Sequence, residues 1–460
     1  MLLAVPVLFG AISLSGCGKE AAPTPYKVDL EIWGLFDDSG AYQESLTAFR
    51  ELNKDHINNI TYRKMSEATY QEDIVRAFAE GKGPDIFLIR NSWLPKFETL
   101  IAPAPAYQFS EKEYRDAFAD VVARDFIVEG KAYGAPLSVD SLALYYNKDL
   151  FNAVGIANPP STWDEFLVDA KALSSIDAYG NIVQSGAAFG TAKNINRSPD
   201  ILLALALQRG AGVESKGSAD TFQIAGDPMN GALDFYSQFS KIGSESYSWN
   251  SRQHYSIDAF YEGSLAMMVN YSWHIDTIRR KNAKLNFAVA ALPQFSGSQP
   301  SNYANYWSFV VAKNKAAPVI AEGQPAPFPA GKYNDLRVHE SWQFLHYFAF
   351  PHPAKSVTLR NPLSDTSVTL PIKDDPTKLY LDKTKKPAAR RDLIEEQKRD
   401  PWLAPFASGN LLAKSWRIGE IERAEGVLAE SIESVDRGEN TVRGALQSAD
   451  AQVRAIIERK

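Results

Sequence analysis

The sequence predicts an α/β fold with room for two domains. Short apolar runs alternate with segments of helical periodicity from Lys27 onward, a pattern typical of strands packed against helices. Two Thr-x-x-Glu patterns, at 69–72 and 162–165, have the spacing of capping boxes and mark helix starts. At 460 residues the chain is long enough for two domains, each with its own core.

The first third of the chain shows strands separated by amphipathic helices. Residues 28–33, 85–89 and 142–146 are apolar runs with the length and composition of strands. A helix is expected after the first of these runs, because Tyr42, Leu46 and Phe49 would share one of its faces. This order of elements is typical of an α/β fold, in which helices flank a sheet.

The rest of the chain continues this alternation. Helices are expected at 163–173, 227–239, 273–280 and 335–349, and strands at 264–269, 286–292 and 307–312. The stretch 313–333 predicts an exposed insertion, 352–386 is expected to be irregular, and the tail 411–459 is expected to be helical.

The N-terminus predicts export and lipidation. Residues 2–14 form an apolar segment of the length of a signal peptide, and small residues lead from it to Cys17, the only cysteine. The segment resembles a bacterial lipobox, which implies a signal peptide over 1–16, a diacylated Cys17 and a tether over 17–26. The alternatives are a buried N-terminal helix or an ordinary signal peptide with a chance cysteine, and no Lys or Arg precedes the apolar run.

Composition and motifs exclude several classes of function. A net charge of −6 argues against a nucleic-acid partner, and a single cysteine permits no internal disulfide. After Cys17 no apolar run approaches the roughly 20 residues that span a bilayer. The sequence contains no G-x-S-x-G, H-E-x-x-H or phosphate-loop motif, and its six histidines form no metal-binding set. We therefore predict no catalytic residue, metal or cofactor.

Four motifs in order resemble the extracellular solute-binding proteins of ABC importers, the group that includes maltose-binding protein. They are Gly-Lys-Gly-Pro-Asp-Ile at 81–86, Tyr-Gly-Ala-Pro at 133–136 leading to Tyr-Tyr-Asn at 145–147, Pro-Pro-Ser-Thr-Trp at 159–163, and Phe-Tyr-Glu-Gly at 260–263 followed by Trp273. The resemblance implies the two-lobed periplasmic-binding-protein fold of type II, with a hinge between the lobes. It places the first lobe at 27–138 plus 300–351 and the second at 139–299 plus 352–460.

The resemblance also suggests which residues contact a ligand. Loops at strand ends and aromatic faces in loops are the expected positions, since a flat apolar ring beside polar groups suits a sugar. Trp163 and Trp342 lie inside helical patterns and are interpreted as structural. The candidate ligand-binding residues are Trp33, Asp37, Arg90, Trp93, Asp140, Asn270, Trp273, Trp307 and Trp416.

The predicted function is that of a monomeric, lipid-anchored receptor in the cell envelope. It is expected to capture a carbohydrate or similar polyol between its lobes and to deliver it to the permease of an ABC importer. One alternative is a receptor for a phosphorylated polyol, a polyamine or a peptide. A phosphate group would need arginines or backbone N–H groups around it, and Arg90 and Arg197 are available for this. Another is a secreted hydrolase, which would show a pair of acids in the cleft.

Overall fold

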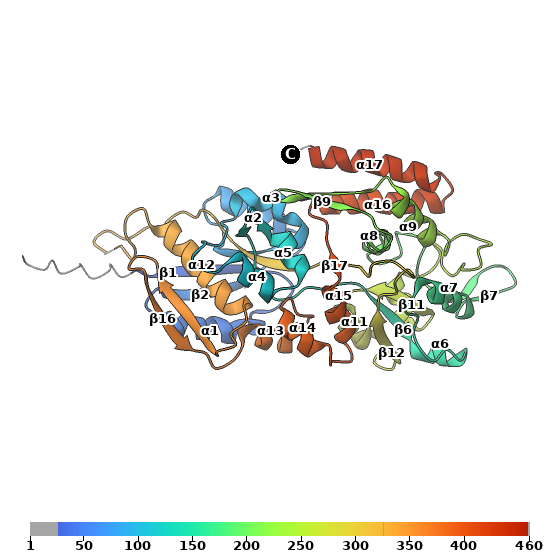
Figure 1. Ribbon diagram of the computed structural model, residues 1–460, viewed down its shortest axis with the longest axis horizontal. Coiled ribbons are helices and arrows are strands. Elements are labelled where there is room, and N and C mark those ends of the chain that lie inside the picture. The colour runs from blue at the N-terminus through green and yellow to red at the C-terminus, as the bar shows by residue number, and fades with distance from the viewer. Residues whose placement is uncertain (1–25, 325, 459–460) are drawn as a thin grey trace, which may run out of the picture.

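The computed structural model describes residues 26–324 and 326–458, which form two lobes lying side by side (Figure 1). Each lobe is built on its own sheet, and helices cover both sheets. The predicted signal peptide, Cys17 and almost all of the predicted tether lie outside the described residues.

The first lobe contains a four-stranded sheet in the order β14-β3-β1-β2. β1 pairs in parallel with β2 and β3, whereas β14 is antiparallel to β3. All residues of β3 are buried, which explains the apolar run of its first four residues, 86–89. The strands of this sheet are β1 (Val28–Gly34), β2 (Ile57–Lys64), β3 (Ile86–Arg90) and β14 (Trp307–Val311).

Helices pack on this sheet through the faces that the sequence predicted. Phe49 of α1 meets Phe344 and Tyr347 of α12, with ring centroids 5.4 and 5.2 Å apart. The expected capping box at Thr69 is not formed, because its hydroxyl donates instead to Asp73 at 2.7 Å. The helices are α1 (Gln43–Leu52), α2 (Tyr70–Ala79), α3 (Leu94–Phe97), α4 (Glu111–Ala117), α5 (Asp120–Phe126) and α12 (Tyr333–Ala349).

A buried ion cluster joins β1, β3 and α12. Asp85, directly before β3, is fully buried. Its Oδ2 accepts from the Glu31 backbone N–H at 2.7 Å and from Lys315 Nζ at 2.9 Å. Its Oδ1 accepts from Nη1 of the fully buried Arg337 at 3.4 Å. The aspartate of the 81–86 motif therefore acts in packing the first lobe.

The second lobe contains a five-stranded sheet in the order β12-β6-β11-β8-β7. β6 is antiparallel to β11 and β12, and β8 is parallel to β11. The Thr162 capping box is confirmed, with its hydroxyl accepting from the Glu165 N–H and the Glu165 carboxylate accepting from the Thr162 N–H. The strands are β6 (Ala143–Asn147), β7 (Ser175–Ile176), β8 (Ile182–Ala187), β11 (Leu265–Asn270) and β12 (Phe287–Ala291).

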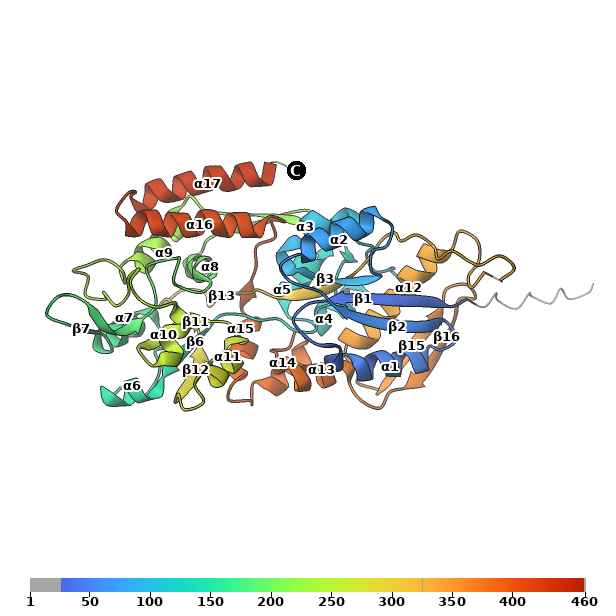
Figure 2. The ribbon, with the colours of Figure 1, turned by 180° about the vertical axis from the view of Figure 1, so that it is seen from behind.

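The C-terminal tail forms two helices that lie along the second lobe (Figure 2). α16 packs against α8, α9 and α17, and the apolar α8 is almost completely buried. The tail was expected to be helical from 411, but its first helix begins at Ile421. The helices of this lobe are α6 (Lys148–Ala153), α7 (Trp163–Ala172), α8 (Ser198–Gln208), α9 (Asp227–Ser237), α10 (Ser256–Glu262), α11 (His274–Lys281), α16 (Ile421–Asp436) and α17 (Val442–Glu458).

The stretch 352–386 differs from the prediction in structure and in position. Instead of being irregular, it forms a hairpin of β15 (Ser356–Asn361) and β16 (Thr366–Pro371), followed by α13 (Pro376–Thr384). These elements pack on the first lobe, because β15 bonds to the α12 side chain Gln343 and α13 contacts α12. Assigning this stretch to the second lobe was therefore wrong.

The chain then passes between the lobes more than once. α14 (Arg391–Gln397) contacts α4 of the first lobe, and α15 (Ala404–Asn410) contacts β12 of the second. The segments between the lobes lie together, since β13 (Asn302–Tyr303) pairs with β17 (Ala413–Lys414) and Ser141 bridges to Ala304. Shorter pairs complete the fold: β4 (Ile127–Val128) with β5 (Lys131–Ala132), and β9 (Val213–Lys216) with β10 (Ala219–Phe222).

The predicted insertion at 313–333 is mostly exposed over its described residues, and Val319 is fully exposed. Among residues 26–324 and 326–458, helices long and apolar enough to cross a membrane do not occur.

A buried carboxyl group in the first lobe predicts a pH effect on stability. Glu340 of α12 accepts from the Tyr26 hydroxyl, from Asn53 Nδ2 at 2.6 Å and from Gln343 Nε2 at 2.9 Å. His56 Nδ1 lies 3.8 Å from its Oε1. Burial raises the pKa of Glu340 to about 7, against an ordinary value of 4.5, although these hydrogen bonds lower it.

Glu340→Gln is expected to gain stability relative to the wild type as the pH rises from 5 to 8. In that interval the native wild type holds a proton that the unfolded chain releases, so its free energy of unfolding falls as the pH rises. The amide mimics the protonated carboxyl and does not titrate, so the variant keeps the stability that the wild type loses. The wild-type loss in free energy of unfolding is on the order of 1–3 kcal/mol. Urea denaturation at several pH values measures the difference in free energy of unfolding between the variant and the wild type. The contributions of all other titrating groups cancel in this difference, because both proteins contain them.

The control is Glu322→Gln on the exposed insertion, for which the difference from wild type is expected to stay flat with pH. A flat difference for Glu340→Gln as well would contradict the prediction.

Candidate ligand cleft

A cavity of about 790 Å³ lies between the two lobes. Residues of both lobes and of the segments between them line it, with aromatic faces and polar groups intermixed. Its main lining residues are Phe36, Asp37, Tyr70, Arg90, Trp93, Ser138, Asp140, Asn196, Arg197, Ser272, Trp273, His274, Asn305, Trp307, Tyr380, Lys386, Glu422 and Glu425.

The wall of the first lobe is aromatic. Trp307 begins β14 and meets Trp93 edge-on, with ring centroids 4.9 Å apart. Phe36, in the loop after β1, meets Trp307 at 5.4 Å and is 45% exposed. The φ of Phe36 is +62°, a left-handed conformation that side chains rarely adopt. The loop thus holds an apolar ring at the cavity at the expense of backbone strain.

The wall of the second lobe presents Trp273. This residue follows β11 and stacks on Tyr271, with ring centroids 4.5 Å apart and planes 18° apart. The Tyr271 hydroxyl donates to Asp200 Oδ2 at 2.7 Å, which fixes the ring beneath Trp273. Because Trp273 is 45% exposed, its indole offers a supported flat surface to the cavity.

Asp140 ties a segment between the lobes to the loop that carries Trp273. Its Oδ1 accepts from the Ser141 N–H at 2.9 Å, and its Oδ2 accepts from the N–H and hydroxyl of Ser272 at 3.0 and 2.5 Å. Burial raises the pKa of Asp140 to about 7, although the bonds from Ser272 and Ser141 lower it. Asp140 therefore positions the Trp273 loop.

Asp37 forms hydrogen bonds with two residues at the C-terminal end of the stretch 352–386, which packs on the first lobe. Its Oδ2 accepts from Tyr42 Oη at 3.1 Å, Tyr380 Oη at 2.9 Å and Lys386 Nζ at 2.5 Å. Sequence reasoning missed Tyr380 and Lys386, because it placed their segment in the other lobe.

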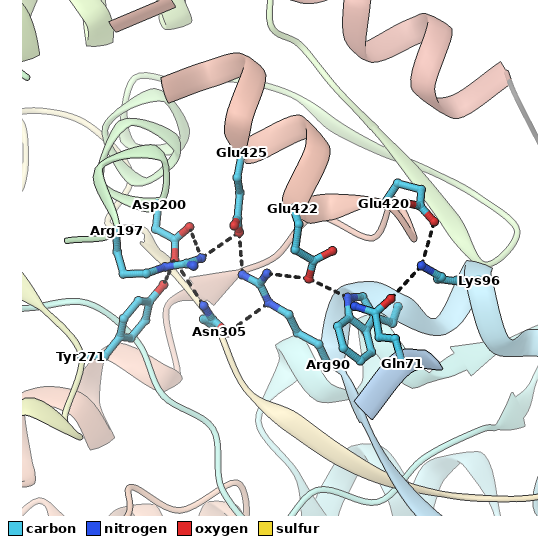
Figure 3. Close-up of polar contacts among 11 residues, drawn as sticks. Gln71, Arg90, Lys96, Arg197, Asp200, Tyr271, Asn305, Glu420, Glu422 and Glu425 are labelled. Atoms are coloured by element: carbon cyan, nitrogen blue, oxygen red, sulfur yellow. Dashed lines mark hydrogen bonds and ion pairs between the residues drawn. The ribbon is translucent and has the colours of Figure 1, made fainter. Parts of the chain in front are cut away.

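Arg90 is the centre of a network that joins the lobes (Figure 3). Its Nη2 bonds to Glu425 Oε1 at 2.6 Å, its Nη1 to Glu422 Oε1 at 3.3 Å and its Nε to Asn305 Oδ1 at 3.3 Å. Arg197, at the start of α8, bonds to the same Glu425 oxygen at 2.7 Å. The first turns of α16 thus link the end of β3 to the second lobe.

Of the predicted ligand-binding residues, Asp37, Arg90, Trp93, Asp140, Trp273 and Trp307 line the cavity. Trp33, Asn270 and Trp416 do not. The Trp33 indole N–H donates to Glu31 at 2.8 Å, and the Arg63 guanidinium lies over the Trp33 ring. This side chain therefore packs against its neighbours on the sheet of the first lobe. Asn270 is buried and its Oδ1 accepts from the Tyr271 N–H at 3.0 Å. Trp416 is buried beside Phe222, before α16 begins.

Two α/β lobes around a shared cavity define the type II periplasmic-binding-protein fold. Its lobes are joined by several crossing segments, as they are here. The chain belongs to the bacterial extracellular solute-binding protein family, whose model matches residues 33–334.

Relatives by sequence are also binding proteins. The maltodextrin-binding protein MdxE of Bacillus subtilis (strain 168) is 26% identical over 329 residues, which is 68% of this chain and 72% of that protein. The galactooligosaccharide-binding protein of the same strain is 22% identical, covering 72% and 76%. Three Brucella proteins named as binding proteins are 25% identical over 223 residues, so the chain spans about half of their length.

Solved structures share the fold over nearly the whole chain. The cyclic alpha-maltosyl-1,6-maltose binding protein from Arthrobacter globiformis has a TM-score of 0.72 at 16% identity, covering 94% of this chain and all of that one. The sugar-binding protein MalE from Xanthomonas citri has a TM-score of 0.64 at 18% identity, covering 94% and 98%. At such identities the likeness establishes the fold alone.

Proposed function

We propose that the protein is the substrate-binding component of an ABC importer and that it captures a carbohydrate in the cleft. The observation that carries this proposal is the pair of aromatic walls, Phe36 and Trp307 on one lobe and Trp273 on the other, with the buried Trp93 packed against Trp307. Aromatic faces on opposite sides of a cavity suit the apolar faces of sugar rings. Polar groups between them, including Asn196, Ser138 and Lys386, supply hydrogen bonds to hydroxyls.

The sequence relatives support a carbohydrate ligand. Their names give maltodextrin, galactooligosaccharide and maltotriose as what they bind. We further propose that the segments between the lobes act as the hinge and that ligand binding shifts the population toward the closed state. The closed protein then passes its ligand, chemically unchanged, to the permease.

A thermal-shift screen with neutral oligosaccharides, sugar phosphates and amines tests the ligand class. A ligand at a hundred times its dissociation constant adds about 2.7 kcal/mol of stability, so binding raises the melting temperature measurably. Maltotriose, galactooligosaccharides and diacetylchitobiose are the first probes. Quenching or enhancement of tryptophan fluorescence is expected for the same ligands, because tryptophans line both walls.

Stabilisation by amines or phosphates with silence across carbohydrates would contradict the proposed ligand class. Detecting a chemically altered ligand by chromatography after incubation would contradict the binding role itself.

Membrane attachment through Cys17 is part of the proposal. Cys17→Ser is expected to move the protein from the membrane fraction to the soluble envelope fraction, because two or three acyl chains are what anchors it. Fractionation and mass spectrometry of the mature N-terminus measure this. The matched control is Ser15→Ala, which leaves the thiol in place, and equal membrane retention of both variants would contradict lipidation.

A further inference from the structure

The cationic side chains that line the cleft are all paired with carboxylates. Lys386 bonds to Asp37 at 2.5 Å. Arg197 makes a two-point contact with Asp200, at 2.8 and 2.7 Å. Arg90 bonds to Glu422 and Glu425. Among the described lining residues, five carboxyl groups stand against these three cations, so the formal charge of the wall is negative; the carboxyl groups are those of Asp37, Glu67, Asp140, Glu422 and Glu425.

One end of the cleft holds the set of donors that an anionic ligand would use. The guanidinium groups of Arg90 and Arg197 converge there (Figure 3). The Trp93 indole N–H lies beside Arg90, because both donate to the same carboxylate oxygen. Arginine pairs are a common means of binding phosphate or carboxylate. This end would be an anion site if nothing else filled it.

Two carboxylates of α16 already occupy these donors. Glu425 Oε1 accepts from both Arg90 and Arg197, at 2.6 and 2.7 Å. Glu422 Oε1 accepts from Arg90 at 3.3 Å and from the Trp93 indole at 2.9 Å. Burial would raise the pKa of Glu425, but the two arginines outweigh it and the pKa lies below its ordinary value. Glu425 is therefore charged at neutral pH.

We propose that Glu422 and Glu425 are specificity-determining residues that exclude anionic ligands and restrict the cleft to ligands without negative charge. A phosphate or carboxylate would have to displace one of these carboxylates and enter a wall with a net negative charge. A neutral hydroxyl meets no such repulsion. The inference rests on the proposed function for its ligand class, but the exclusion of anions is a property of the cleft alone.

The arrangement also requires both lobes. Arg90 and Trp93 belong to the first lobe, whereas Arg197 and the α16 carboxylates belong to the second. The exclusion is therefore strongest when the lobes are together, which is the state that holds a ligand.

Calorimetric titration of the full protein with inorganic phosphate, glucose 6-phosphate and maltotriose tests the proposal. The wild type is expected to bind neither anion. The double variant Glu422→Gln/Glu425→Gln removes two negative charges and keeps the side-chain size. We expect it to gain affinity for phosphate or glucose 6-phosphate by at least tenfold. The single variant Glu422→Gln, at a half-exposed position, carries the test if the double variant folds poorly.

Glu420→Gln is the matched control. Glu420 precedes α16, pairs with Lys96 at 2.9 Å and does not line the cavity. Glu420→Gln removes one negative charge, as Glu422→Gln does, and this control variant is expected to leave anion binding unchanged.

The outcomes separate this inference from the proposed function. Anion binding by the wild type, or no gain in the double and single variants, overturns the inference even if maltotriose or another neutral sugar binds. Failure of every carbohydrate to bind the wild type overturns the proposed function, and the phosphate titrations still decide the inference.

Discussion

Arg337→Ala is expected to lower the free energy of unfolding by about 3–5 kcal/mol, the range seen when one partner of a buried ion pair is removed. Arg337 is fully buried, and Asp85 beside it is also fully buried. Besides Asp85, its Nη2 donates to the backbone carbonyls of Ala312 and Lys313 at 2.7 and 3.1 Å. The alanine variant leaves these acceptors and the carboxylate short of donors, and Lys315 is then the one cation paired with Asp85 among the residues that the structure describes.

Urea denaturation measures this loss, and Arg454→Ala provides the control. Arg454 pairs with Asp450 on the surface of α17 at 2.8 Å, and its side chain is 72% exposed. An exposed pair of this kind contributes about 0–1 kcal/mol. Equal losses for the two variants would show that the Asp85 cluster does not hold β1, β3 and α12 together.

Trp273→Ala is expected to weaken binding of the carbohydrate identified by the thermal-shift screen by about 30-fold, or about 2 kcal/mol. The indole lies on Tyr271 and faces the cavity, so the variant loses the flat surface without opening the core. Because the side chain is partly exposed, the free energy of unfolding is expected to change by less than about 1 kcal/mol.

Trp402→Ala is the matched control for ligand binding. Trp402 packs against Arg279 at 4.0 Å and against Phe287, and it does not line the cavity. Calorimetry is expected to show unchanged affinity for this variant. Similar affinity losses for both tryptophans would mean that Trp273 acts through the stability of the second lobe and not through contact.

The residues at strand ends were predictable because the resemblance to solute-binding proteins implies ligand contacts from loops at strand ends. Arg90 ends β3, Asp140 precedes β6 and Trp273 follows β11, and all three line the cavity. Trp33 shows the limit of this reasoning. It also lies near a strand end, but side chains alternate along a strand, and that of Trp33 is held against Arg63 and Glu31.

The position of 352–386 was missed although its sequence contains a usable signal. Val357 and Leu359 alternate with polar residues, and Val368 and Leu370 do the same after a turn, which is the pattern of a hairpin. The lysines and prolines of the same stretch are typical of irregular structure, and they favoured the wrong prediction. Because the segment was placed in the other lobe, Tyr380 was missed as a partner of Asp37.

The pairing of Glu425 with Arg90 had no local signal. The two residues are more than three hundred positions apart, and an acidic residue near the start of a surface helix is ordinary. Only the packing of α16 across the second lobe brings that carboxylate to the end of β3.

The sheet of the first lobe has a consequence for the order in which the chain is assembled. One edge of β3 stays unpaired until β14 is available. β14 is synthesised more than two hundred residues later, after all strands of the five-stranded sheet of the second lobe. Pairings so distant in sequence form slowly, and an unpaired apolar strand can associate with other chains. A nascent or freshly translocated molecule therefore passes through a period of vulnerability to aggregation that ends only when Trp307–Val311 is in place.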